Sequence, residues 1–310
     1  MIKKKIILFF LLIICLNFKV LSKENIYIVY KIDGEIITNI DITNEQKYLL
    51  ALNSQLESLS DDQLSDISEQ SIIRETIKKK EIIKFFKLDQ SDQFISDFID
   101  DLYLRLELNN KEELEQYLNK FDLNISDIKK KIEIEMFWNR LIYQKYKNQI
   151  NINEASIKQK INDEGVQDNK KIFLLTEIVF QKKNDMSKDE QLKKLTKSID
   201  EVGFKNTASI YSLSDSAKLG GDIGWIDETS LSREILKELN NINIGDFVGP
   251  LTVGSNFLLL KVENIKFEKK ENDKKIKLEN MIIFETNRQL EQFSKIYFDR
   301  IRINTNINEL

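Results

Sequence analysis

Apolar positions along the chain change their spacing several times, and each change predicts a different kind of element. Residues 26–38 alternate apolar and polar side chains on both sides of Asp33-Gly34, which is the pattern of a β-hairpin. Residues 60–70 are polar and predict a loop. Elsewhere in the first half apolar residues recur every three or four positions, which predicts helices at residues 41–57, 71–87, 92–108, 111–121, 126–150 and 153–162.

The second half begins with a different pattern. Residues 172–180 form a short apolar run that predicts a buried strand, and a glycine-rich stretch of small residues follows at 209–225. Residues 264–278 are charged and predict a loop. The remaining patterns predict helices at 187–201, 232–239 and 281–299, strands at 248–251 and 257–262, and an edge strand within 300–308.

Two helices carry capping boxes, in which a Ser or Thr side chain is followed three residues later by Gln or Glu. Thr43 with Gln46 is expected to begin the first helix, and Ser187 with Glu190 the helix that ends near Glu201. The elements between 170 and 265 make a compact α+β domain. A terminal helix and strand cannot bury their apolar faces alone, so residues 279–310 are expected to pack on the N-terminal helices.

The N-terminus has the pattern of a secretory signal. Lys3-Lys4-Lys5 precede an apolar run from Ile6 to Leu16, which is too short to span a membrane as a helix. Cleavage after Ser22 gives 1–22 as the signal peptide. The alternative is an uncleaved anchor. Without residues 1–22 the chain has 43 basic and 51 acidic residues, a formal charge of −8, and no cysteine.

Composition removes several classes of function. The chain of 310 residues contains no histidine, which excludes Ser-His-Asp triads, Cys-His dyads and histidine-ligated metals. Nine glycines and one proline are too few for a turn-dense β-sandwich or propeller. The acidic charge argues against nucleic acid as a partner. No cofactor or metal is expected.

Residues 172–265 resemble the parvulin-type peptidyl-prolyl isomerase domain. The resemblance rests on FLLTEIVF, GFKNTASIYSLSDSAKLGGDIGW, INIGDFVGPL and FLLLKVEN, in that order. The surroundings resemble the SurA family of periplasmic chaperones, whose N-terminal domain opens with a strand of the kind seen in VYKIDGEIITNIDI. The implied fold class is α+β: a helical domain at 23–165, completed by a C-terminal helix and strand at 279–310, with a parvulin-like domain inserted at 170–265.

The resemblance also implies site positions. In the parvulin pattern two histidines pair beneath a proline pocket, and the matching positions here are Glu177 and Leu258. Leucine has no hydrogen-bonding group, so this pair cannot form. The acidic or thiol position falls near Ser214, beside Asp215. The proline pocket corresponds to a peptide-binding groove formed by Leu231, Ile235 and Phe257.

The two replaced histidine positions leave two interpretations open. Burial would raise the pKa of Glu177 unless it finds a partner. Glu177 is then either a new acid in a cleft or part of a groove that is no longer selected for catalysis.

Four other groups of residues have a structural interpretation as well as a functional one. Gly220-Gly221-Asp222 with Gly224 is either a phosphate loop or a turn with positive φ that Trp225 anchors to the core. The acidic residues between 61 and 69 are either a Ca²⁺ loop or a solvated loop. Lys78-Lys79-Lys80 is expected to form a solvated helix face. Phe85-Phe86 is expected in the core, or alternatively in a client-binding groove.

These features predict a periplasmic chaperone that binds unfolded outer-membrane proteins or other extended peptides through apolar grooves. The alternative is a prolyl isomerase with residual activity from its pocket. A membrane-anchored foldase is a third possibility if the signal is not cleaved. After cleavage no stable membrane insertion is expected.

Overall fold

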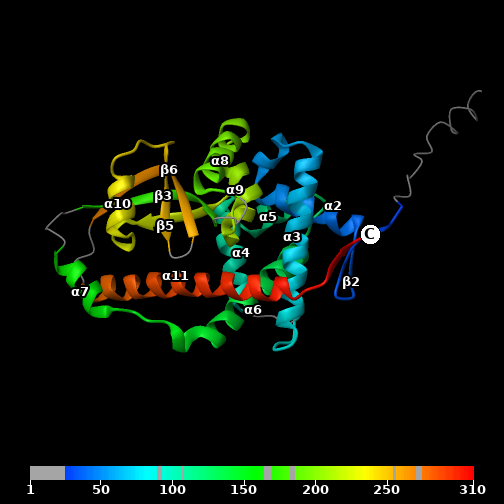
Figure 1. Ribbon diagram of the computed structural model, residues 1–310, viewed down its shortest axis with the longest axis horizontal. Coiled ribbons are helices and arrows are strands. Elements are labelled where there is room, and N and C mark those ends of the chain that lie inside the picture. The colour runs from blue at the N-terminus through cyan, green and yellow to red at the C-terminus, as the bar shows by residue number, and fades with distance from the viewer. Residues whose placement is uncertain are drawn as a thin grey trace, which may run out of the picture.

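The computed structural model describes residues 25–88, 93–106, 108–163, 169–181, 186–253, 256–269 and 274–310. The predicted signal peptide at 1–22 lies outside the described residues. Figure 1 shows an α+β domain, here called the inserted domain (residues 169–269), beside a helical domain that contains both the first elements and the last helix. Helix α11 runs beneath the inserted domain and continues into the helical domain. The predicted fold class is confirmed.

The chain begins with the predicted hairpin, strands β1 (Ile28–Ile32) and β2 (Glu35–Thr38). Strand β7 (Ile307–Glu309) adds to β1, giving the sheet order β2-β1-β7. The ends of the chain therefore close one sheet. This sheet packs Ile32 and Ile37 against Ile42 and Ile77 of the first two long helices.

Two predictions for the first helices are wrong. Helix α2 (Asn39–Leu52) is capped by Thr38 with Asp41, whereas the Thr43 hydroxyl donates to the Asn39 carbonyl inside the helix. The stretch 60–70 is not a loop, because helix α3 (Asp61–Ile82) begins there with a capping box of Ser60 and Gln63. The polar residues that suggested a loop or a Ca²⁺ site form the first turns of this amphipathic helix.

The other helices of this domain lie close to their predicted positions. They are α4 (Gln93–Arg105), α5 (Lys111–Asn119), α6 (Ile125–Tyr146) and α7 (Glu154–Asp163), with short 3₁₀ turns η1 (Ser54–Ser58) and η2 (Lys147–Gln149). Trp138 on α6 is fully buried, and its indole N–H donates to Ser294 of α11 at 2.8 Å. Phe86 packs against Phe137 as expected, but Phe85 is half exposed.

The C-terminal helix is longer than predicted. Strand β6 (Asn256–Lys269) occupies residues 264–269 of the predicted loop at 264–278. Helix α11 (Lys274–Ile303) occupies residues 274–278 of that loop and the first four residues of the predicted strand at 300–308. Ile301 packs on the helical core, whereas Ile303 is 83% exposed, because residues two apart lie on opposite sides of a helix. Of the predicted strand only β7 is extended. Tyr297 of α11 is buried against Trp138 and donates its hydroxyl hydrogen to Glu81.

The inserted domain is a four-stranded antiparallel sheet in the order β4-β3-β6-β5. Its elements are β3 (Asn169–Phe180), α8 (Lys188–Val202), α9 (Phe204–Tyr211), η3 (Asp215–Leu219), β4 (Asp222–Asp227), η4 (Glu228–Ser230), α10 (Arg233–Leu239), β5 (Phe247–Val253) and β6 (Asn256–Lys269). The predicted Ser187–Glu190 capping box is present. Helices α8 and α9 cover one face of the sheet, and α10 packs on the other.

The glycine-rich stretch forms the turn between η3 and β4. Gly220, Gly221 and Gly224 all have positive φ, as predicted for a turn. Trp225 does not anchor this turn in the core, because it is 42% exposed and lies under the Lys266 ammonium. The backbone is held instead at Gly221, whose carbonyl accepts the Glu177 N–H at 2.8 Å.

Candidate functional site

A cavity of about 410 Å³ lies between the inserted domain and α11. The six residues that the sequence singled out all line it: Glu177, Ser214, Leu231, Ile235, Phe257 and Leu258. They come from β3, η3 and its preceding turn, the α10 region and β6. On the opposite wall α11 contributes Phe284, Glu291 and Lys295.

The floor of the cavity is apolar. Leu231 and Ile235 pack on the core formed by Leu258, Leu260 and Val248 of the sheet. The Phe257 ring lies 5.5 Å from that of Phe180, with the Lys188 ammonium 4.7 Å from its centre. The groove predicted from the parvulin pattern is therefore present as an apolar surface, and its binding role stays a prediction.

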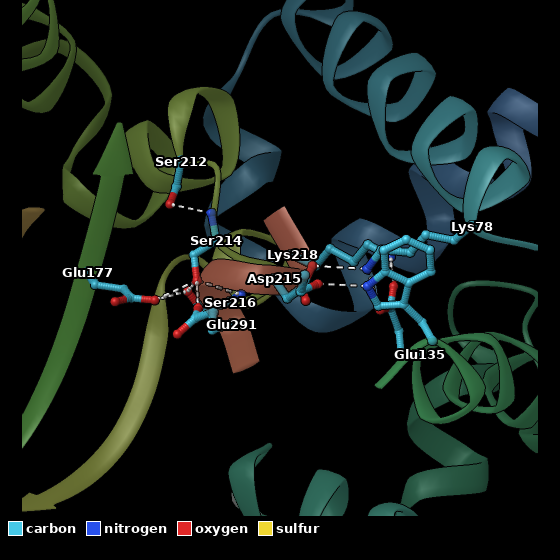
Figure 2. Close-up of polar contacts among 11 residues, drawn as sticks. Lys78, Glu135, Glu177, Ser212, Ser214, Asp215, Ser216, Lys218 and Glu291 are labelled. Atoms are coloured by element: carbon cyan, nitrogen blue, oxygen red, sulfur yellow. Dashed lines mark hydrogen bonds and ion pairs between the residues drawn. The ribbon is translucent and has the colours of Figure 1, made fainter. Parts of the chain in front are cut away.

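A corner of the cavity is polar and contains Glu177. Ser214 and Ser216 donate to Glu177 Oε1 at 2.6 and 2.9 Å (Figure 2). Ser214 Oγ also lies 3.2 Å from Oε1 of Glu291 on α11. A hydroxyl has one proton, so Ser214 cannot donate to both carboxylates at once. It can donate its hydrogen to Glu177 and accept a hydrogen bond from the O–H group of a neutral Glu291.

The electrostatics of this corner favour a bound proton. Burial raises the pKa of the Glu177 carboxyl above its ordinary value, although the two serine hydroxyls act in the opposite direction. Burial and the nearby Glu177 raise the pKa of Glu291 to about 7. Among the described residues no Lys or Arg forms a salt bridge with either carboxylate.

The other side of the same turn faces the helical domain. Lys78 of α3 forms salt bridges with Asp215 at 3.0 Å and with Glu135 of α6 at 2.6 Å. Lys218 of η3 also reaches Glu135, at 3.2 Å. Figure 2 shows Asp215 pointing toward Lys78 while Ser214 points toward Glu177.

The lysine run is therefore not one solvated face. The Lys78 side chain is only 3% exposed, because the helix turns it toward Trp138 and Glu135. The two ammonium groups lower the pKa of Glu135 to about 2 against the opposing effect of burial. The signal in the sequence was the position of Lys78 directly after Ile77, on the buried stripe of α3.

Further polar contacts attach the inserted domain to the first helices. Asn206 of α9 donates to the Gln55 carbonyl and to Ser58 Oγ, both at 3.0 Å. Asn53 donates to Ser209 at 3.3 Å. These contacts and the Lys78 network form one interface, called here the dock.

Sequence reasoning missed the contribution of α11 to the cavity. Glu291 and Lys295 are four residues apart on one helix face, and Lys295 donates to Asn256 Oδ1 at 3.1 Å. Helical spacing alone shows that these two side chains share a face. It does not show that this face meets Ser214 and Asn256, which lie 77 and 39 residues earlier in the chain.

The polar corner limits the chemistry that the cavity can perform. It offers a carboxyl held by two hydroxyls, but no histidine and no thiol. Within the part of the chain that the structure describes, no group of three or more Asp or Glu side chains has the arrangement of a metal site. None of the described helices is long and apolar enough to cross a membrane.

The cleft lies over a four-stranded antiparallel sheet, in an α+β domain inserted into a helical domain, and is bordered by residues of the α10 and η3 regions. The family model of the PPIC-type PPIase domain, called Rotamase, matches residues 172–264. The chain therefore contains a PPIC-type PPIase domain, which confirms the resemblance seen in its motifs. No curated protein matches the chain.

Solved structures that are similar to the chain include a PpiC-type isomerase domain, SurA-like chaperones and PrsA proteins. A PpiC-type isomerase domain is 21% identical, covering 33% of this chain and 95% of its own, with a TM-score of 0.28. A structure described among the SurA-like chaperones of Campylobacter jejuni is 14% identical, with 91% and 98% covered and a TM-score of 0.34. PrsA from Bacillus subtilis is 17% identical, with 88% and 91% covered and a TM-score of 0.28. TM-scores this low do not define a shared overall arrangement.

Proposed function

We propose that this protein is a chaperone that binds extended segments of unfolded polypeptides in the cavity between its PPIC-type domain and α11, without catalysing prolyl isomerisation. Clients are unfolded outer-membrane proteins, and the site of action is the periplasm, reached through the signal at 1–22. The apolar floor formed by Leu231, Ile235 and Phe257 carries this proposal, because it offers an unfolded segment an apolar contact surface without any reacting group.

The polar groups beside this floor argue against catalysis. An isomerase must stabilise an amide that is twisted over a barrier of about 18–20 kcal/mol. At the two histidine positions of the pattern stand Glu177, whose carboxyl is already held by two serines, and Leu258, which has no polar group. Asp215, the carboxylate next to Ser214 in the chain, is paired with Lys78 at the dock.

Aggregation of an unfolded outer-membrane β-barrel protein tests the binding proposal. The chain from Lys23 onward is expected to suppress aggregation at stoichiometric ratios. Leu231→Arg, which places a charge on the apolar floor, is expected to lose most of this effect. Ile283→Arg is the matched control, because Ile283 is 57% exposed on α11 and does not line the cavity. Equal activity of both variants, or none in the native chain, contradicts the proposal.

Prolyl isomerisation of a short X-Pro peptide separates the chaperone from the alternative enzyme. The native chain is expected to give no rate above background. A double variant, Glu177→His with Leu258→His, shows in the same assay whether the fold accepts the pattern's pair. A clear native rate that disappears in Leu231→Arg but not in Ile283→Arg supports a residual isomerase instead.

A further inference from the structure

The cavity between the inserted domain and α11 has walls that are fixed to one another. Helix α11 is held on the helical domain by the hydrogen bonds from Trp138 to Ser294 and from Tyr297 to Glu81. The inserted domain is held on the same helical domain by the dock. The cavity of about 410 Å³ is therefore formed before a client binds, and its lining residues determine which ligand it accepts.

Two carboxylates in this cavity have oxygen atoms that the protein leaves unused. Ser214 and Ser216 donate to Oε1 of Glu177 (Figure 2). Ser214 also contacts Oε1 of Glu291. Oε2 of each glutamate has no hydrogen bond and no salt bridge with the residues that the structure describes. Glu177 and Glu291, called here the acidic pair, therefore offer two acceptors to a ligand that can donate hydrogen bonds.

Five described basic side chains also line the cavity, but none forms a salt bridge with the acidic pair: Arg74, Lys78, Arg288, Lys295 and Arg302. Lys78 is bound at the dock, and Arg288 pairs with Glu285. Lys295 donates to Asn256, and Arg74 lies over the Phe298 ring. Arg302 follows Glu291 by three helical turns, about 16 Å along the axis. Lys295 lowers the pKa of Glu291, but burial and Glu177 outweigh this effect, so the pair lacks a compensating cation.

The walls next to the acidic pair are apolar. Leu231, Ile235 and Phe257 form the floor, and Phe284 belongs to the opposite wall on α11. A Lys or Arg side chain combines an apolar stem with a charged head that donates hydrogen bonds. The stem can contact the apolar walls while the head reaches the acidic pair. A cationic side chain therefore matches both parts of this lining.

A second feature of the lining indicates a peptide. Gln292, the residue after Glu291, also lines the cavity, and its Nε2 is buried without a hydrogen-bond partner among the described residues. A buried donor that lacks an acceptor is costly. The backbone carbonyl groups of a polypeptide are acceptors of the kind that this amide lacks. The lining thus has a donor for a peptide backbone and acceptors for a cationic side chain.

We propose that the cavity selects client segments in which a Lys or Arg residue stands beside apolar residues, and that Glu177 and Glu291 accept hydrogen bonds from its cationic side chain. The inference rests on the proposed function, because it names the kind of segment that the same cavity binds. The client supplies the positive charge that the acidic pair lacks, and charge-assisted hydrogen bonds are stronger than neutral ones. Its apolar residues contact the floor.

Calorimetric titration with short peptides tests this selection. The peptides have the sequence Ser-Leu-X-Phe-Ser with both ends capped, so that X carries the only charge, and X is Lys, Arg, Gln or Glu. The chain from Lys23 onward is used at pH 8, above the pKa of about 7 of Glu291. The Lys and Arg peptides are expected to bind about tenfold more tightly than the Gln peptide. The Glu peptide is expected to bind more weakly than the Gln peptide, because it adds a third carboxylate. Comparison of the Lys and Arg peptides shows which head group the pair prefers.

Variants identify the groups responsible. The double variant Glu177→Gln with Glu291→Gln is expected to bind the Lys, Arg and Gln peptides within about twofold of one another, because only neutral acceptors remain. Its affinity for the Gln peptide is expected to be unchanged, which also shows that the cavity is intact. Glu279→Gln is the matched control, because Glu279 is an exposed acid on α11 that does not line the cavity. This control is expected to keep the full preference.

Three results overturn the proposal: equal binding of the Lys and Gln peptides by the native chain, a preference that survives in the double variant, or no binding of any peptide. The first two leave binding of the Gln peptide and suppression of aggregation in place, so the proposed function stands without the selection. A chain that binds no peptide and does not suppress aggregation contradicts both proposals.

Discussion

The two sides of the turn at η3 are built from neighbouring residues but have opposite electrostatics. At the dock, Asp215 and Lys218 join Lys78 and Glu135, so two positive groups meet two negative ones. At the cleft, Ser214 stands between Glu177 and Glu291, and none of the described Lys or Arg side chains is bonded to either carboxylate. At the dock each charged group has a partner of opposite charge, which suits a permanent interface. The cleft keeps a charge imbalance that only a proton or a ligand can relieve.

A charged side chain that is removed from water is tolerated in the folded state only when it has a partner of opposite charge. A buried ion pair contributes little net stability, but removing one member leaves the other uncompensated, which is costly. We therefore expect the dock to be sensitive to the loss of a charge. The cleft should tolerate, or even favour, such a loss.

Loss of Lys78 is expected to give the largest effect. Lys78→Met removes the ammonium group that Glu135 and Asp215 share, while Lys218 stays beside Glu135. It should lower the free energy of unfolding by about 3 kcal/mol, the lower end of the range for a broken buried pair. Urea unfolding at pH 7 measures this. Lys79→Met is the control, because Lys79 is the exposed neighbour in the same run and should change stability by less than about 0.5 kcal/mol.

The pH dependence of Lys78→Met provides a second check on the dock. The pKa of Glu135 is lowered to about 2, so its contribution to stability is complete above 4.5 and is lost as pH falls toward 2. The difference between native and variant should shrink over that range. Equal losses for Lys78→Met and Lys79→Met at pH 7 contradict a compensated dock.

The sequence was sufficient for much of the fold and for the list of cleft residues. Helical and strand spacing located most elements, and the motifs around Glu177, Ser214 and Leu258 placed them in one domain, where they now line one cavity. The sequence-based prediction is wrong where two positions satisfy the same local rule for a helix start. Thr38, not Thr43, begins α2, because either residue has an acceptor side chain three positions later and tertiary packing decides between them.

The dock and the contact of α11 with the cleft could not be predicted from the sequence. A run of three lysines predicts a solvated helix face, but the partner of Lys78, Asp215, lies 137 residues later in the chain. The same holds for Glu291, which meets Ser214 across 77 residues. Spacing rules describe one element at a time, and pairing of distant charges depends on how two domains are placed.

The turn that positions Glu177 should be sensitive to a single methyl group. At Gly221 a Cβ would lie 2.2 Å from the Glu177 carbonyl oxygen, and φ is +80°. Gly221→Ala is expected to destabilise the protein by about 2–3 kcal/mol, from backbone strain plus this overlap. Gly224→Ala has a similar φ of +75° but open space, so about 1 kcal/mol is expected. Thermal unfolding of both variants measures the difference, and equal losses would show that the carbonyl contact is unimportant.

The smallest expected effect has the opposite sign and tests the cleft. Because burial raises the pKa of Glu177, the folded state loses stability as pH rises above the ordinary value of 4.5. Glu177→Gln keeps the shape and an acceptor for Ser214 but cannot ionise. It is expected to raise the free energy of unfolding by about 0.5–1 kcal/mol at pH 7.5 and to have no effect at pH 4. Glu190→Gln, a capping carboxyl on α8 whose pKa is lowered by its bonds to Ser187, should show the reverse: a loss at pH 7.5. If Glu177→Gln destabilises the protein at pH 7.5 as Glu190→Gln does, the cleft is compensated after all, and its contrast with the dock disappears.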